Sequence, residues 1–373
     1  MSLTIINADK AHMQAAIRLA QRGLGQTWPN PSVGCVIVLN DILVGRGWTQ
    51  QGGRPHAETV ALNQAGNAAL GAAVYVTLEP CSHKGVTEPC AKALIDAGVA
   101  RVVIGIEDPD PRVNGRGIKM LREAGIEVTV GVCATEAERV TSGFLKRNKD
   151  NRPQITLKFA TTLDGRIATK SGDSKWITGD FARRSGHMLR ANHDAILVGS
   201  LTALQDDPSL TCRLPGMFNR SPLRIVVDGR MRLPLTHNLV VGAPEIPTWL
   251  FTFSETQENA DRRRAYQAAG VKIFDINLDE NGYPDLKVLV GILADKGITR
   301  LLVEGGGTIA AAFLKLGLID EVFWYRSAKI IGNEGLPAIG GMGVECLQDA
   351  ICMKTHYVER VGDDFIEQYS LIG

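Results

Sequence analysis

His56-Ala57-Glu58, followed by Pro80-Cys81 and then by Cys90, is the stretch of sequence that decides the fold of the N-terminal half. One histidine and two cysteines can supply the three protein ligands of a zinc ion whose fourth position is left for water. The second cysteine lies nine positions after the first, whereas the common form of such a motif has only two residues between them. The pattern predicts a zinc site with an insertion between its cysteine ligands.

Glu58 favours a catalytic interpretation of this motif. Zinc lowers the pKa of a bound water toward neutrality, and a carboxylate beside the metal can move protons from that water to a ring nitrogen and a leaving amine. A Glu two residues after the His ligand is typical of hydrolytic deaminases of the cytidine type. The alternatives are buried cysteines without a metal, or a closed structural site with His83 as fourth ligand; a closed site has no use for Glu58.

Length and composition describe a globular protein with large cores. The 373 residues are enough for two ordinary domains, and 45% of them are hydrophobic. A formal net charge of +1 gives no global attraction to nucleic acid or to an anionic membrane. The seven scattered cysteines and the absence of a signal peptide indicate free thiols and a cytoplasmic protein. No apolar run approaches the length of a membrane span.

Helices alternate with apolar strands in the N-terminal half. The helical pattern predicts helices at 8–23, 56–67, 90–97 and 115–125, and short apolar runs predict strands at 34–39, 73–78, 101–106 and 126–130. Continuous apolar strands between helices indicate a sheet that is covered on both faces. Because the metal-binding segments lie where helices begin, we expect the ligands to converge at one edge of that sheet.

The pattern changes at residues 145–153, which are polar and charged and end in a proline. We place a domain boundary there, with a first domain at 1–147 and a second at 148–373. A second α/β series follows, with strands predicted at 155–160, 195–199, 223–228, 248–252, 300–304, 321–325 and 365–370.

A glycine-rich turn follows one strand of the second half. Gly305, Gly307 and Ala310 satisfy G-x-G-x-x-A, a pattern that lets the backbone approach a pyrophosphate at a helix N-terminus. A tight strand-to-helix turn is the alternative. The acidic ribose-binding residue expected some twenty positions later is not evident, so a standard Rossmann domain is not predicted.

Two other segments place polar residues beside strands. Lys158 precedes the turn Thr161-Thr162-Leu163-Asp164-Gly165, and Asp206-Asp207-Pro208 precedes Arg213 in a loop. Lys158 could equally be an ordinary edge lysine. The two aspartates could equally cap a helix or form a turn before Pro208.

Together these residues resemble one family, the bifunctional riboflavin-biosynthesis deaminase/reductase of bacteria. The resemblance runs over nearly the whole chain and includes the family's own spacing between Cys81 and Cys90. Its motifs in this sequence are PNPSVGCVIV at 29–38, PHAE at 55–58, YVTLEPCSH at 75–83, LK at 157–158, TLDGR at 162–166, WIT at 176–178, DDPSLTCR at 206–213 and EGG at 304–306.

The resemblance implies a fold and two successive reactions. The fold is a cytidine-deaminase-like three-layer α/β/α domain followed by a dihydrofolate-reductase-like α/β domain. The first reaction is zinc-dependent hydrolytic deamination of 2,5-diamino-6-(5-phosphoribosylamino)pyrimidin-4(3H)-one to 5-amino-6-(5-phosphoribosylamino)uracil. The second reaction is NADPH-dependent reduction of the ribosyl group to ribityl. A dihydrofolate-reductase-like domain also accounts for a glycine turn without a Rossmann fingerprint.

The resemblance also implies roles for individual residues. In the deaminase, one zinc ion is held by His56, Cys81 and Cys90, Glu58 moves protons, and Asn30 holds the pyrimidine. In the reductase, the residues that line the NADPH site are Ala160, Trp176, Thr202, Asp206, Asp228, Gly305, Gly306 and Gly307. The residues that face the substrate are Ser174, Arg190, Leu210, Arg213 and Glu304. Lys158 and Asp206 are the candidates for polarising or protonating the sugar, and the two arginines suit a phosphate because a guanidinium binds its oxygens bidentately.

The chain departs from the family pattern between its cysteine ligands. The family usually has a basic residue and then a proline where this chain has Val86 and Glu88. If that basic residue contacts the substrate phosphate, the contact is missing here or is made by Lys84. We expect a consequence for substrate affinity alone.

The resemblance further implies a homo-oligomer with a small phosphorylated pyrimidine as substrate. Two other functions compete with it. A nucleic-acid deaminase is disfavoured by the near-zero net charge and by the lack of an aromatic-basic strip. A non-catalytic zinc scaffold is disfavoured by Glu58 and by the glycine turn.

Overall fold

The computed structural model describes residues 3–83, 88–110, 113–280 and 282–372. The chain divides into two compact units, which are described separately here. Unit 1 consists of Met1–Arg152 together with Lys296–Thr299, and unit 2 consists of Pro153–Asp295 together with Arg300–Gly373.

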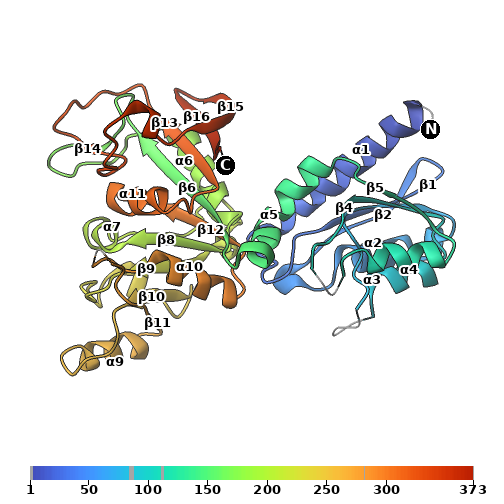
Figure 1. Cartoon of the computed structure of the whole chain (residues 1–373), viewed down its shortest axis with the longest axis horizontal. Helices are drawn as coiled ribbons and strands as arrows, with labels where there is room; N and C mark the ends of the chain where they lie inside the picture. The colour runs from blue at the N-terminus through green and yellow to red at the C-terminus, as the bar shows by residue number, and fades with distance from the viewer. Residues whose placement is uncertain (1–2, 84–87, 111–112, 281, 373) are drawn as a thin grey trace. The chain divides into compact units, whose positions relative to one another are not determined.

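Unit 1 is built on a mixed five-stranded sheet (Figure 1). The strand order is β2 (Ile42–Trp48), β1 (Gly34–Leu39), β3 (Ala73–Leu78), β4 (Arg101–Ile106) and β5 (Glu127–Val130). β1 runs antiparallel to both of its neighbours, whereas β3, β4 and β5 are parallel to one another. Three parallel strands therefore end at the same edge of the sheet.

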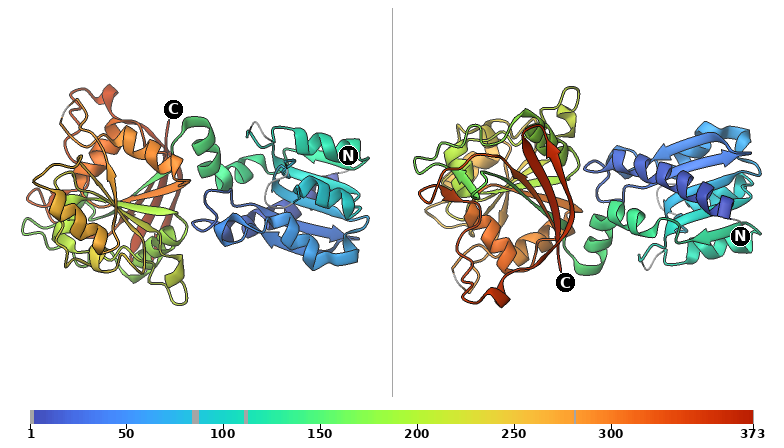
Figure 2. Two further views of the ribbon diagram at one scale, coloured as in Figure 1. Left: turned by 90° about the horizontal axis from the view of Figure 1, so that it is seen from below. Right: turned by 90° about the horizontal axis from the view of Figure 1, so that it is seen from above.

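Helices cover both faces of this sheet, as the views from opposite sides in Figure 2 also show. α1 (Leu3–Ala20) and α5 (Ala134–Asp150) pack on one face, and α2 (Ala57–Ala65), α3 (Cys90–Asp96) and α4 (Arg116–Glu123) pack on the other. Small residues let these layers approach closely. A Cβ on Gly34 of β1 would lie 1.9 Å from the carbonyl oxygen of Ala16 in α1. The three-layer α/β/α arrangement expected from the resemblance is confirmed.

Unit 2 contains a nine-stranded sheet. Its strand order is β11 (Lys272–Asp275), β10 (Thr248–Thr252), β9 (Leu223–Val227), β8 (Ala195–Gly199), β12 (Arg300–Glu304), β6 (Gln154–Thr161), β13 (Glu321–Arg326), β16 (Asp364–Leu371) and β15 (Met353–Val361). The strands from β11 to β13 are parallel, and only β16 and β15 at the far edge are added antiparallel. In an open α/β sheet, ligands bind outside the carboxyl ends of the parallel strands.

The remaining elements of unit 2 connect and cover these strands. The helices are α6 (Asp180–Ala191), α7 (Ser200–Asp206), α8 (Asn238–Val241), α9 (Ala260–Ala268), α10 (Leu286–Asp295) and α11 (Gly307–Lys315). β7 (Arg166–Ala168) and β14 (Leu336–Pro337) form a separate two-stranded sheet. α7 follows β8 and α11 follows β12, so both helices begin at the edge where the parallel strands end.

Most predicted elements are present within a few residues of their expected bounds, and the differences have local causes. Residues 145–153 were expected to be a polar boundary segment, but α5 continues to Asp150. Its charges suit an exposed helix face, where Lys146 pairs with Asp150 one turn away at 3.4 Å. The edge strands β2, β11 and β15 were not predicted, because their exposed residues interrupt the apolar pattern.

Within the part of the chain that the structure describes, no helix combines the length and the apolar character needed to cross a membrane.

Candidate functional site

The three predicted zinc ligands come together in unit 1. His56 is the N-cap of α2, Cys90 is the first residue of α3, and Cys81 follows β3. Their ligand atoms all lie within 4.8 Å of one another. The Nδ1 of His56 is 3.3 Å from the Sγ of Cys90 and 3.7 Å from the Sγ of Cys81. Two helix starts and one strand end therefore converge as the sequence predicted.

These distances fit zinc. A tetrahedral zinc ion with Zn–N near 2.0 Å and Zn–S near 2.3 Å separates its nitrogen and sulfur ligands by about 3.6 Å. The two observed separations lie on either side of this value. The backbone N–H of Cys90 donates to the Sγ of Cys81 at 3.3 Å, which favours a thiolate there. Hydrogen bonds from Cys90 and His56 lower the pKa of Cys81 to about 4 despite its burial.

Glu58 lies in the first turn of α2, beside the ligand group, and is 4% exposed. Burial, with the charge of Cys81, raises its pKa to about 7. Its carboxylate is not one of the three grouped ligands. A buried carboxyl beside a metal-binding group, but outside the ligand set, is placed to exchange protons with whatever occupies the open position.

Asn30 is tied to the segment that leads into His56. Its side-chain amide donates to the carbonyl oxygen of Gly53 at 3.4 Å. Gly53 has φ of +84°, and a Cβ there would lie 1.9 Å from the Nδ2 of Asn30. Only glycine allows this approach, so the Asn30 loop depends on Gly53.

Glu79 is a supporting residue that the sequence analysis did not identify. It is 3% exposed, and its carboxylate accepts hydrogen bonds from the backbone N–H groups of Asp108, Gly115, Gly117 and Ile118 at 2.8–3.2 Å. These contacts fix the end of β3, two residues before Cys81, against the start of α4. In the sequence, the only sign of this role is that a Glu directly precedes Pro80 and Cys81.

The proposed fourth ligand of a closed site does not join the group. Among the described residues, the metal-binding group contains His56, Cys81 and Cys90 but not His83. This arrangement favours a site with an open position. Lys84 and Val86, where the sequence departs from the family pattern, lie outside the described residues, and Glu88 is exposed.

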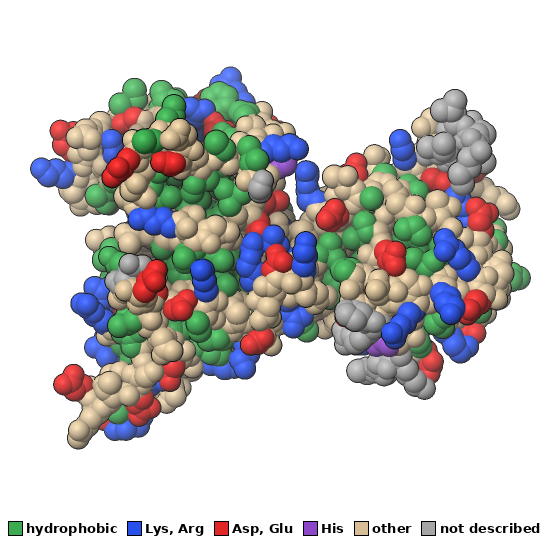
Figure 3. All heavy atoms as spheres, in the orientation of Figure 1, with side chains coloured by type: hydrophobic (Ala, Val, Ile, Leu, Met, Phe, Trp, Pro, Cys, Tyr) green, Lys and Arg blue, Asp and Glu red, His purple; other side chains and the backbone are tan. Residues whose placement is uncertain are grey.

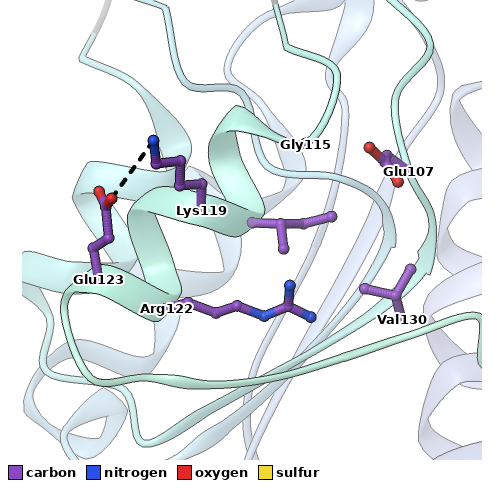
Figure 4. Close-up of a pocket in the computed structure, with 7 residues that line it drawn as sticks. Glu107, Gly115, Lys119, Arg122, Glu123 and Val130 are labelled. Carbon is purple, nitrogen blue, oxygen red and sulfur yellow. Dashed lines mark ion pairs between the residues drawn. The ribbon is translucent and has the colours of Figure 1, made fainter.

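A cavity of about 450 Å³ also lies in unit 1, along α4 and β5, and none of the zinc ligands lines it. Figure 4 shows the ion pair of Lys119 and Glu123 at 3.8 Å, with Arg122 extending across the pocket from the same helix. The predicted chemistry is elsewhere, so the size of this cavity does not identify it as the active site.

Unit 2 contains a buried charge cluster made by three of the predicted site residues. Arg190 of α6 donates from Nε and Nη2 to the two carboxylate oxygens of Glu304, at 2.9 and 2.8 Å. The Nζ of Lys158 on β6 lies 4.0 Å from the same carboxylate. Burial alone would raise the pKa of Glu304, but Arg190 and Lys158 lower it to about 2. Burial lowers the pKa of Lys158.

Arg190 and Arg213 are connected through the loop after α7 and through a histidine. Arg190 also donates from Nη1 to the carbonyl oxygen of Thr211 at 3.0 Å, and the Nε of Arg213 lies 3.4 Å from the Nε2 of His187. Burial and the two arginines lower the pKa of His187 to about 4. An imidazole kept neutral in this way adds no further positive charge beside Arg213. His187 was not singled out from the sequence.

A cleft of about 400 Å³ lies in the same unit, lined by α7, the end of β9 and the glycine turn. Thr202, Asp228 and Gly306 of the predicted cofactor site line it. Gly305 and Gly306 have φ of +94° and +67°, and a Cβ on Gly305 would lie 2.8 Å from Thr202. The turn therefore presents backbone without side chains at the N-terminus of α11, which suits the phosphates of a dinucleotide.

The other predicted residues of unit 2 lie outside the lining of this cleft. Asp206 lies at the end of α7 and is in part exposed; its partial burial raises its pKa, and Lys175 opposes that change. Trp176 is 58% exposed, with the guanidinium of Arg183 4.5 Å from its ring. Ala160 lies on β6, Leu210 is buried, Ser174 is half-buried, and Gly307 starts α11.

Comparisons with known proteins agree with this geometry. Residues 6–106 match the model of the cytidine and deoxycytidylate deaminase zinc-binding region, and residues 153–366 match that of the RibD C-terminal domain. The chain is 44% identical to the riboflavin biosynthesis protein RibD of Escherichia coli K12, over 95% of this chain and 97% of that protein. It is 41% identical to the RibD protein of Bacillus amyloliquefaciens, over 95% and 94%.

Comparison with solved structures also finds RibD proteins. Acinetobacter baumannii RibD superposes with a TM-score of 0.87 at 38% identity, covering 99% of this chain and 100% of that one. A Thermotoga maritima protein described as a diaminohydroxyphosphoribosylaminopyrimidine deaminase/5-amino-6-(5-phosphoribosylamino)uracil reductase superposes at 0.86, with 34% identity and coverage of 98% and 99%.

Fold and site thus define a two-domain enzyme in which a zinc-binding deaminase domain precedes a reductase domain. The chain belongs to the RibD family, the bifunctional deaminase/reductases of riboflavin biosynthesis.

Proposed function

We propose that unit 1 deaminates 2,5-diamino-6-(5-phosphoribosylamino)pyrimidin-4(3H)-one to 5-amino-6-(5-phosphoribosylamino)uracil, and that unit 2 then reduces the ribosyl group of this product to ribityl with NADPH. The observation that carries the proposal is the group of His56, Cys81 and Cys90 with the buried Glu58 beside it, in a chain similar to RibD proteins over almost its full length.

In the deaminase, His56, Cys81 and Cys90 would hold one zinc ion. Zinc, when bound, supplies a Lewis acid that makes water a nucleophile near neutral pH. Glu58 would take one proton from the attacking water and pass it to the ring nitrogen, and would then carry the second proton of that water to the leaving amine, which departs as ammonia. The Asn30 amide can both donate to and accept from a pyrimidine edge, and its bond to Gly53 holds it in one orientation.

In the reductase, the cleft along Thr202, Asp228 and Gly305–Gly307 would bind NADPH, which supplies a hydride. Arg190 and Arg213 would hold the substrate phosphate, with Ser174, Leu210 and Glu304 completing the substrate site and Ala160 and Trp176 the cofactor site. Lys158 is supported as the proton donor to the sugar because it is held by Glu304 inside the charge cluster. Asp206, the second candidate, lies at the end of α7.

A split assay tests the two steps. Zinc-loaded protein receives the diamino substrate without NADPH, and ammonia release is followed; NADPH is added only when release is complete. We expect ammonia first and then oxidation of NADPH that requires the deaminated product. Ammonia release without later NADPH oxidation would refute the assignment of unit 2.

The same proposal includes a domain boundary between residues 147 and 148, a cytoplasmic location and a homo-oligomeric state. The last of these rests on the resemblance alone, and light scattering of the purified protein measures it directly.

A further inference from the structure

Two arginines, Arg230 and Arg232, lie on the wall of the cleft that contains the glycine turn. β9 ends at Val227, and the turn that follows carries Asp228, Gly229 and both arginines. The cleft therefore has two chemically different parts. One is a bare backbone at the start of a helix, and the other presents two guanidinium groups.

Asp228 carries a negative charge, which would disfavour the binding of an anion in this cleft. An acidic residue after a strand commonly accepts a hydrogen bond from a ribose 2′-hydroxyl and disfavours a phosphate at that position. Here, however, the side chain of Asp228 is only 1% exposed, and its Oδ2 accepts from the backbone N–H of Leu233 at 2.9 Å. Its Oδ1 faces the Nε of Arg232 at 3.7 Å. The buried carboxylate therefore contacts Arg232 on the Nε side of its guanidinium group.

Arg232 is held on two sides and remains open to the cleft. Its Nη2 donates to the Oγ of Ser200 at 2.6 Å, so the side chain is fixed between the turn after β9 and the first residue of α7. The side chain is still 47% exposed. Because a planar guanidinium has five N–H donors, these contacts leave donors for an oxyanion.

Aromatic side chains stand beside the arginines. Phe253 and Tyr283 line the same cleft, and Gly229 lies under the ring of Phe253, where a Cβ would be 2.5 Å from it. Flat aromatic faces suit a purine base. An adenosine at this end would place its ribose near Arg230 and Arg232, and its 5′-phosphates would run toward the glycine turn.

We propose that Arg232, positioned by Asp228 and Ser200 and assisted by Arg230, binds the 2′-phosphate of the adenosine ribose and makes the reductase selective for NADPH over NADH. This inference rests on the proposed function, because it assumes that the cleft binds a nicotinamide dinucleotide. It adds the residues that decide which dinucleotide is bound.

Adenosine 2′,5′-bisphosphate and adenosine 5′-monophosphate test the proposal, since they differ only in the 2′-phosphate. Isothermal titration calorimetry on the full-length protein measures both dissociation constants without any turnover. We expect the wild type to bind the bisphosphate about 10- to 100-fold more tightly, as charge-assisted hydrogen bonds imply. In Arg232→Ala this ratio should fall to about 1- to 3-fold, while binding of the monophosphate stays unchanged.

Arg264→Ala is the matched control. Arg264 is an exposed arginine on α9 that pairs with Asp261, away from the lining of the cleft. It should keep the wild-type ratio, which excludes an effect of net charge alone. Ser200→Ala should lower the ratio less than Arg232→Ala, because it removes a positioning contact and keeps the guanidinium.

The outcomes separate this inference from the proposed function. Equal affinity of the wild type for the two probes, or an Arg232→Ala variant that keeps the wild-type ratio or loses both probes equally, would overturn the role of Arg232 and leave the cleft as a nucleotide site. Failure of the wild type to bind either probe, or NADPH itself, would overturn the cofactor assignment and the inference with it.

Discussion

The buried group in unit 1 and the buried group in unit 2 are built in opposite ways. In unit 1, His56, Cys81 and Cys90 bring nitrogen and sulfur ligands together, and one of them, Cys81, favours the thiolate form. The negative charge of this group is compensated only when a cation binds. In unit 2 one carboxylate, that of Glu304, pairs with two cationic side chains, Arg190 at 2.8 Å and Lys158 at 4.0 Å. The first group depends on a metal for its charge balance, whereas charges of opposite sign in the second group compensate one another in part without a bound ion.

The sequence separation of the two groups differs as well. His56 and Cys90 are 34 positions apart, at the starts of helices that flank β3 in the chain, whereas Arg190 and Glu304 are 114 positions apart. A local group can be supplied by one motif, but a long-range ion pair exists only once the whole sheet has formed. We therefore expect changes in unit 1 to alter chemistry first, and changes in the charge cluster of unit 2 to alter stability first.

The largest expected effect is that of Glu58→Gln on deamination. Loss of a positioned proton-transfer group reduces kcat by about 10²- to 10⁴-fold. Ammonia release measures this, and zinc content per chain should stay at the wild-type value because Glu58 is outside the ligand group. NADPH oxidation with the deaminated substrate should be unchanged. Loss of zinc together with activity would mean that Glu58 is structural.

Glu304→Gln removes the carboxylate that compensates part of the positive charge in the unit 2 cluster. The substitution leaves Arg190 and Lys158 with less compensating charge inside the protein, where their side chains are 15% and 20% exposed. Breaking a buried pair in this way costs about 3–5 kcal/mol. Urea unfolding followed in unit 2 measures the loss.

Asp363→Asn is the control for that experiment. Asp363 pairs with Arg360 at 3.4 Å but is fully exposed, so water already screens the pair. The unfolding transition should not move. If Glu304→Gln also left the unfolding transition unchanged, the cluster would contribute no more to stability than a surface ion pair does.

The sequence predicted the local features of both units better than the long-range ones. The zinc ligands, Glu58 and most strands were predictable because each depends on a short motif or a short apolar run. The clamp of four backbone N–H groups on Glu79 and the histidine between Arg190 and Arg213 were not, because their partners come from other elements. The polar segment 145–153 was expected to mark a domain boundary, yet α5 continues through it to Asp150.

His193 makes the stability of unit 2 depend on pH. It is 2% exposed, its Nδ1 lies 2.6 Å from the carbonyl oxygen of Leu189, and its Nε2 lies 2.9 Å from the hydroxyl of Thr156. Burial and the charge of Arg300 lower its pKa from 6.5 to about 3. Below pH 6.5 the unfolded chain therefore binds a proton that the folded chain does not.

The stability that comes from keeping His193 neutral is complete above pH 6.5 and is lost as the pH falls toward 3. Between pH 6.5 and 5 the loss is about 2 kcal/mol. The free energy of unfolding of unit 2, measured by urea titration at several pH values, should show this slope, and His193→Gln should flatten it. An unchanged slope in the variant would assign the pH dependence to other groups, with His187 the first of them.

The smallest effect is expected for an exposed charge pair beside the zinc group. Lys92 and Asp96 lie one turn apart on α3, at 2.7 Å, with side chains 51% and 58% exposed. Lys92→Ala should change the stability of unit 1 by less than about 0.5 kcal/mol and leave zinc affinity as it was. Cys90 is the first residue of the same helix. If Lys92→Ala weakened zinc binding, α3 would be held in place by its surface charges. The contrast between a unit 1 site that depends on a metal and a unit 2 site that depends on ion pairs would then fail.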